Sequence, residues 1–302
     1  MPRWFKRSLV GVAALALVAA GTIGAGAAIG QAKRHRIVAV SAHPIDLRAD
    51  AGRIERGRYL FTSRGCSECH GANGAGRVVI DDTAHGMRVV SPNISPGAGS
   101  VVQAYRAEDW ERTVRHGVDP HGRPLLVMPA EDYNRLTDDD VAAVAAYVRQ
   151  LPPAAGGPAS LTLPPLFPVL YGFGVIKDAA EKIDHTLPPA TPVPEGVTVD
   201  HGRTIGQMCQ GCHGPHLSGG KVPGAPPDWP AAANLTPGAA SAMRRYPDAA
   251  AFKAMLRSGR RPDRTAVSKV MPFESLAALT DQDAEALYLF LRSLPPRDAG
   301  SR

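Results

Sequence analysis

The chain of 302 residues has few aromatic side chains, at 6% of its composition, and only four cysteines. It also has no glycine-rich phosphate loop, no nucleophile motif and no paired-carboxylate motif. Those patterns mark the sites of many hydrolases, kinases and glycosidases. We therefore predict that the chain is not an enzyme in its own right.

Acidic side chains are absent from residues 1–36, which carry six basic ones. The whole chain has 34 basic and 28 acidic side chains, so residues 37–302 hold 28 of each sign. A nucleic-acid-binding protein needs its excess positive charge on the folded body. The net charge of +6 lies at the N-terminus instead, so we predict no nucleic-acid partner.

Charges are also absent from residues 8–32, which follow three basic residues. A basic start before an apolar run is typical of a segment that directs export, so we predict a periplasmic location for the rest of the chain. The small residues Ala25-Gly26-Ala27 suit cleavage of a signal peptide, yet the run is also longer than the roughly 20 residues that cross a bilayer. Residues 1–36 are therefore predicted to form an apolar helix that is either a cleaved signal or an inner-membrane anchor.

The body of the chain repeats itself at an offset of 143 residues. The offset carries Cys66 onto Cys209, His70 onto His213, Met128 onto Met271, Thr137 onto Thr280 and Leu151 onto Leu294. We therefore predict two similar domains, at residues 37–151 and 199–302. A proline-rich linker at 152–198 joins them.

Each copy is predicted to hold three helices joined by long loops, so the fold is predicted to be all-α. Thr137 and Thr280 each precede an aspartate by three residues, a pattern that caps the start of a helix. The linker has an apolar centre at residues 166–176. This centre could cover a partner, lie on a membrane or pack against the two domains.

The four cysteines form the segments Cys66-Ser67-Glu68-Cys69-His70 and Cys209-Gln210-Gly211-Cys212-His213. A four-cysteine zinc site usually closes within about 20 residues of sequence, but these pairs are 143 residues apart. Redox-active dithiols give no reason for the histidines, and a disulfide across two residues would be strained. Cys-x-x-Cys-His is the attachment signature of c-type haem. The sequence therefore predicts two covalently bound haem c groups, with His70 and His213 as ligands of the iron.

From about residue 50 onward, apart from the linker, the chain resembles the class I cytochrome c family. That resemblance implies two tandem cytochrome c domains and a methionine as the second axial ligand of each iron, in a loop before the last helix. Met128 and Met271, each between Val and Pro, stand at this position. It also implies that Asn93 and Asn234 support the haem propionates or the methionine sulfur.

Other methionines and histidines are rival candidates for the iron ligands. The rival ligands are Met87, His116 and His121 in the first copy and Met243, Met255 and His216 in the second. None of these rivals repeats at the common offset. The remaining histidines, His35, His43, His85, His185 and His201, are predicted to be solvated surface residues.

A finer resemblance rests on Ser91-Pro92-Asn93-Ile94, Asp109-Trp110, His116-Gly117-Val118, Gly122-Arg123, Met128-Pro129 and Leu151-Pro152-Pro153. Here the chain is similar to cytochrome c subunits of bacterial membrane-associated alcohol and gluconate dehydrogenases. Those subunits typically carry three haem motifs, whereas this chain has two. The resemblance implies electron transfer from a dehydrogenase subunit to the quinone pool or a terminal oxidase. A dihaem shuttle between respiratory complexes and, with less support, a dihaem peroxidase are the alternatives.

Overall fold

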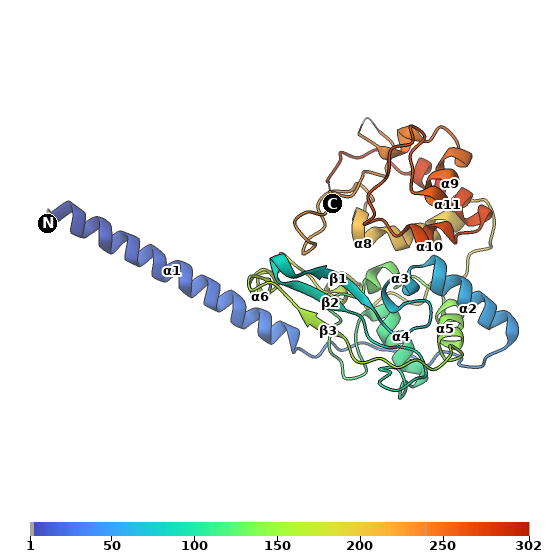
Figure 1. Cartoon of the computed structure of the whole chain (residues 1–302), viewed down its shortest axis with the longest axis horizontal. Helices are drawn as coiled ribbons and strands as arrows, with labels where there is room; N and C mark the ends of the chain where they lie inside the picture. The colour runs from blue at the N-terminus through green and yellow to red at the C-terminus, as the bar shows by residue number, and fades with distance from the viewer. Residues whose placement is uncertain (1–2, 239, 302) are drawn as a thin grey trace.

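The computed structural model describes residues 3–238 and 240–301 as two lobes and a projecting N-terminal helix (Figure 1). The projecting helix, α1 (Arg3–Arg34), has 32 residues. By length and composition it could cross a membrane. The predicted apolar helix therefore exists as a continuous element, and most of its side chains are exposed.

The first lobe consists of helices around an apolar core. Its helices are α2 (Ala51–Ser63), α3 (Cys66–His70), η1 (Thr83–His85), α4 (Ala107–His116), η2 (Ala130–Asp132) and α5 (Asp138–Val148). Leu60 and Phe61 of α2 pack with Val141 and Val144 of α5 in this core. Thr137 accepts a 3.1 Å hydrogen bond from the amide of Asp140, which confirms the predicted start of the last helix.

The second lobe repeats this arrangement. Its helices are α7 (Val199–Gly206), η4 (Gln207–Cys209), α8 (Gln210–His213), η5 (Ala242–Arg245), α9 (Ala249–Ser258), α10 (Phe273–Ala277) and α11 (Asp281–Ser293). The core includes Ile205, Phe252, Leu287 and Leu291. Thr280 accepts the amide of Asp283 at 3.1 Å, as Thr137 does in the first lobe.

A glycine brings the first and last helices of each lobe into close contact. A side chain at Gly57 would lie 1.9 Å from the carbonyl oxygen of Ala143, and one at Gly202 would lie 1.9 Å from that of Ala286. The two lobes therefore share the same tight helix crossing. The glycines are 145 residues apart, so the repeat slips by two residues here.

A small antiparallel sheet adds to the predicted helices. Strands β1 (Val78–Asp82), β2 (Met87–Val90) and β3 (Ser160–Thr162) pair in the order β1-β2-β3. Its third strand comes from the linker, so Val89 pairs with Leu161. Such pairing between distant segments leaves no local periodicity in the sequence, which explains why the helical repeat did not reveal it.

The linker continues into α6 (Phe167–Gly172) and η3 (Ala179–Glu181). α6 packs against α1. The linker therefore forms part of the folded body, beside the first lobe and the base of α1.

Candidate functional site

The first Cys-x-x-Cys-His segment forms the short helix α3 between two glycines with positive φ. Gly65 has a φ of 82° and Gly71 a φ of 75°, conformations that favour glycine. Cys66, Cys69 and His70 line a cavity of about 940 Å³, and Met128 lines it from the loop before η2. The structure thus brings four predicted site residues of the first copy to one cavity.

Most of the other groups around this cavity are apolar. They include Phe61, Ile94, Val102, Trp110 and Leu125. A cavity with two thiols, an imidazole and a thioether among apolar walls fits the edge, iron and apolar faces of a haem.

Both histidines are oriented by the same backbone contact. His70 Nδ1 lies 3.1 Å from the carbonyl oxygen of Pro92, and His213 Nδ1 lies 2.7 Å from that of Ala233. A carbonyl only accepts, so Nδ1 donates and the lone pair of each ring is on Nε2. This contact fixes the tautomer of a metal-binding imidazole. Burial also lowers the pKa of His70, which favours the neutral ring that a metal requires.

The thiols do not have the properties of a redox-active dithiol. All four cysteines are free of disulfides. Burial raises the pKa of Cys66 and of Cys209 to about 12, whereas reactive thiols have a lowered pKa. Over residues 3–238 and 240–301, no group of three or more His, Cys, Asp or Glu side chains could hold a metal ion.

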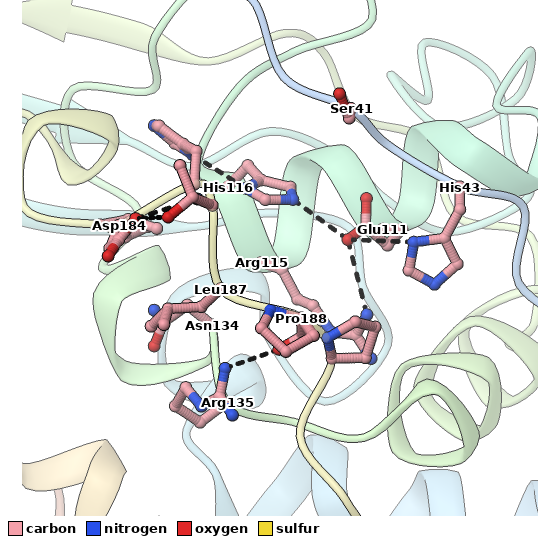
Figure 2. A pocket seen from close by; sticks show the side chains of 14 residues that line it. Ser41, His43, Glu111, Arg115, His116, Asn134, Arg135, Asp184, Leu187 and Pro188 are labelled. Carbon is pink, nitrogen blue, oxygen red and sulfur yellow. Dashed lines mark hydrogen bonds and ion pairs between the residues drawn. The ribbon is translucent and has the colours of Figure 1, made fainter.

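The rival ligands lie in different surroundings. His116 belongs to a separate polar pocket of about 190 Å³, where it contacts Glu111 (Figure 2). Its other ring nitrogen, Nδ1, lies 2.8 Å from Nδ1 of His185. Met243 and Met255 belong to the core of the second lobe, and Met271 packs at its edge. His216 is exposed. Of the three rivals in the first lobe, His121 lines the cavity with Met128, whereas His116 and Met87 do not.

The two asparagines are buried and hold loops together by hydrogen bonds. Asn93 donates to the carbonyl of Ala154 at 2.9 Å, and Asn234 donates to that of Arg297 at 2.8 Å. Their carbonyl oxygens accept from the hydroxyls of Ser95 and Thr236. Support of the haem propionates or the methionine sulfur by Asn93 and Asn234 stays a prediction. Both asparagines tie their loop to the segment after the last helix.

The two Cys-x-x-Cys-His segments meet the opposite lobe through matching contacts. Glu68 Oε1 accepts from the amide and hydroxyl of Ser275, both at 3.0 Å. Asp132 Oδ1 accepts a 2.7 Å bond from the amide of Gly211. Glu68 and Gly211 are equivalent at the offset of 143, as are Asp132 and Ser275. The lobes thus pack by an approximate two-fold relationship that places both segments at one junction, defined here by these four residues.

A charged network lies beside this junction. Asp283 of α11 accepts from Tyr59, from Arg64 at 3.4 Å and from His201 at 2.8 Å. Burial opposes ionisation, but the bonds from Tyr59 and His201 prevail and lower the pKa of Asp283. His201 is only 4% exposed, so its prediction as a surface residue was wrong. His201 contacts Asp283 instead of solvent, and this partner on α11 lies 82 residues later in the chain.

Sequence reasoning missed Asp132, Ser275 and Asp283 as contact residues. The repeat itself held a signal for the first two, because each lies four residues after a Met of the Val-Met-Pro segments. That position becomes meaningful only when the opposite lobe is in place.

A comparison with family models decides what these two lobes are. The model described as cytochrome c matches residues 54–152 and again residues 199–295. The chain belongs to the cytochrome c family. With two such domains and one Cys-x-x-Cys-His segment in each, this cytochrome binds two haem c groups covalently.

Curated relatives are similar to this cytochrome over most of its length. It is 27% identical to the fructose dehydrogenase cytochrome subunit of Gluconobacter japonicus, over 81% of this chain and 53% of the relative. It is also 27% identical to the gluconate 2-dehydrogenase cytochrome c subunit of Pantoea cypripedii, over 84% and 62%. The alcohol dehydrogenase (quinone) cytochrome c subunit of Komagataeibacter europaeus is 27% identical over 82% and 57%. This cytochrome therefore spans between half and two thirds of the length of these relatives.

Proposed function

We propose that this cytochrome transfers electrons on the periplasmic side of the inner membrane, as the electron-accepting subunit of a membrane-associated dehydrogenase. The quinone pool or a terminal oxidase would receive the electrons. The observation that carries the proposal is the junction at which both attachment segments meet. Similarity over more than 80% of the chain to cytochrome subunits of three dehydrogenases supports the kind of partner.

Four cysteines and two histidines would hold the cofactors. Cys66 with Cys69, and Cys209 with Cys212, would form the thioether bonds, while His70 and His213 would bind iron through Nε2. Haem c supplies reversible one-electron chemistry at its iron. The carbonyls of Pro92 and Ala233 would keep each imidazole in its ligand orientation.

Met128 and Met271 would each supply the second protein ligand of one iron. A thioether ligand raises the potential of haem iron, and two protein ligands leave no position for a substrate. Met128 already lies at the cavity that holds His70. This ligand set suits an electron carrier and disfavours a peroxidase.

The junction would bring the two attachment segments close enough for electrons to pass within the chain. Glu68 and Ser275 fix one side of it, and Asp132 and Gly211 fix the other. Because hydrogen bonds and not flexible linker residues define this contact, the relative placement of the two sites is held constant. A carrier with two sites can accept electrons at one lobe and release them at the other.

The electron-carrier assignment is tested by an optical spectrum of the purified protein, oxidised and reduced, before and after carbon monoxide. We expect two low-spin haems that do not respond to the gas. Binding of carbon monoxide at either haem would contradict its methionine ligand and would favour the peroxidase.

The partner assignment is tested on membranes washed with high salt and then solubilised in mild detergent. We expect a dehydrogenase subunit to co-purify with the cytochrome and to reduce its haems when the dehydrogenase substrate is added. A cytochrome that purifies alone, and that a quinol-oxidising complex reduces instead, would contradict the dehydrogenase and support the shuttle.

A further inference from the structure

α1 and α6 form a joint that depends on the absence of side chains. A Cβ on Gly30 would lie 2.0 Å from the carbonyl oxygen of Pro168, and one on Gly172 would lie 2.1 Å from that of Gly26. A Cβ on Gly26 would lie 2.5 Å from a ring carbon of Phe173. The backbones are therefore in direct contact, and both Gly26 and Gly30 are buried although most of α1 is exposed.

Charged groups continue this joint through the last turn of α1 and just beyond it. Lys33 Nζ donates to the carbonyl of Tyr171 at 2.8 Å and pairs with Glu181 at 2.8 Å. Arg36 forms a bidentate pair with Asp178 at 2.7 and 3.0 Å, and Tyr171 also donates to this carboxylate. Burial opposes the ionisation of Asp178, but the bonds from Arg36 and Tyr171 outweigh this effect and lower its pKa. The folded body thus grips the last part of α1 and the residues after it.

The residues just before and just after α6 include exposed apolar side chains. Leu166 is 53% exposed, Phe173 51% and Val175 60%. These three residues, called the α6 patch below, adjoin the joint with α1, whose own apolar side chains are also exposed. One environment that covers the apolar surface of α1 would therefore also cover the patch.

The length of α1 places this patch at the edge of a bilayer. At 1.5 Å per residue, the helix rises about 27 Å from Ser8 to Gly26. The hydrocarbon core is about 30 Å thick, so Gly26 and Gly30 would lie at its outer boundary when Arg7 is at the inner one. Lys33 and Arg36 would then lie among the headgroups.

We propose that α1 is retained as a membrane anchor and that the α6 patch lies in the outer interface of the lipid bilayer beside it. The proposal rests on the proposed periplasmic location, but not on the haem ligands. Arg34 and His35, directly after the joint, line the cavity of the first lobe. The first haem site is therefore held next to the membrane surface.

Retention is tested by the intact mass of the full chain extracted from membranes. We expect a protein that still contains α1 and resists extraction at alkaline pH. A mass that corresponds to a chain starting after Ala27 would overturn the proposal, because cleavage there removes Gly26 from the joint.

Membrane contact of the patch is tested with single cysteines placed at matched exposures. Phe173→Cys is compared with Val197→Cys, whose native side chain is 45% exposed in the linker before α7. The purified full-length variants, with both haems attached, are placed in vesicles of phosphatidylethanolamine and phosphatidylglycerol and treated with a water-soluble maleimide. We expect labelling at position 173 to be at least about tenfold slower than at 197, because the bilayer interface excludes the reagent.

Glycine variants test whether protection of position 173 from the maleimide depends on the contact between α6 and α1. In the Phe173→Cys chain, Gly30→Leu should force α6 away from α1 and abolish the protection, while Gly24→Leu, which has nothing within 4 Å, should preserve it. Equal labelling at 173 and 197 would overturn the proposal. So would protection in native membranes but not in lipid vesicles, since a partner subunit would then cover the patch. A haem that binds carbon monoxide would contradict the proposed electron carrier but would leave these labelling results unchanged. The proposed function and the proposed membrane contact can therefore fail independently.

Discussion

Asp132 of the first lobe accepts a 2.7 Å hydrogen bond from the amide of Gly211, inside the haem-attachment segment of the second lobe. The equivalent pair, Ser275 and Glu68, forms the same contact in the reverse direction. Self-complementary contacts of this kind are typical of two-fold interfaces between separate subunits. Here a tandem repeat has the interface within one chain, and it brings the two redox sites together.

Loss of these contacts should uncouple the lobes. Asp132→Ala leaves the Gly211 amide without this acceptor, and Glu68→Ala does the same for Ser275. Glu68→Ala should cost about 1–3 kcal/mol, because the Ser275 donor is buried, whereas Asp132→Ala should cost about 1 kcal/mol, because Gly211 is only half-buried. Denaturant unfolding, followed at the haem absorbance, should show one transition in the wild type and two in the double variant. The exposed neighbour Glu274 supplies the control, Glu274→Ala. A double variant that unfolds like this control would contradict the role of the junction.

The network around Asp283 should make stability depend on acid. Its folded-state pKa is lowered, so its contribution is complete above the ordinary Asp pKa of about 3.9 and is lost as the pH falls through the lower folded value. Asp283→Asn should cost about 2–3 kcal/mol at neutral pH, because the neutral amide accepts the bonds from Tyr59, Arg64 and His201 more weakly than the carboxylate does. Thermal unfolding should then vary less with pH below about 4 than in the wild type. The exposed Asp200→Asn should retain the wild-type pH profile, and an identical profile in both variants would count against the network.

Met128→Ala should keep the first haem but change its iron. The thioether that raises the potential is removed and one axial position opens. A redox titration should show one haem with a lowered potential, and carbon monoxide should bind to that haem alone. His121→Ala, which changes another side chain of the same cavity, should alter neither property. If His121→Ala opens the iron and Met128→Ala does not, the ligand assignment is wrong.

Removal of one pair of attachment cysteines should affect one lobe. Cys209→Ala combined with Cys212→Ala should leave a single covalent haem, detected by intact mass and by haem staining of denatured gels. The second lobe should lose stability because its core forms around the cofactor, while the first lobe keeps its spectrum. Two covalent haems in this variant would show that the second segment is not an attachment site.

The helix crossing at Gly57 should tolerate no side chain. Gly57→Ala places a methyl group 1.9 Å from the Ala143 oxygen and should cost about 1–3 kcal/mol through displacement of α2. Gly52→Ala, in the same helix but 3.4 Å from its nearest neighbour, should be neutral or stabilise by up to about 1 kcal/mol. Urea unfolding of the two variants tests the crossing, and equal midpoints would contradict it.

Local patterns in the sequence were enough to predict the family, the cofactors and the starts of the last helices. Cysteine spacing is a covalent requirement of haem attachment, and Thr137 and Thr280 cap helices through residues only three positions away. Such signals lie within a few residues, so a single sequence contains them. The assignment of particular ligands, among them Met128 and Met271, stays a prediction that the proposed variants test.

Only the tertiary structure decided how these parts meet. The third strand of the sheet, the burial of His201, the loop contacts of Asn93 and the joint of α6 with α1 all depend on partners that are distant in sequence. The sequence determined two haem-binding units and an apolar helix, because both follow from short-range spacing and composition. The junction between Asp132 and Gly211, and the backbone contact between Gly30 and Pro168, arise from packing in three dimensions, which no local pattern specifies.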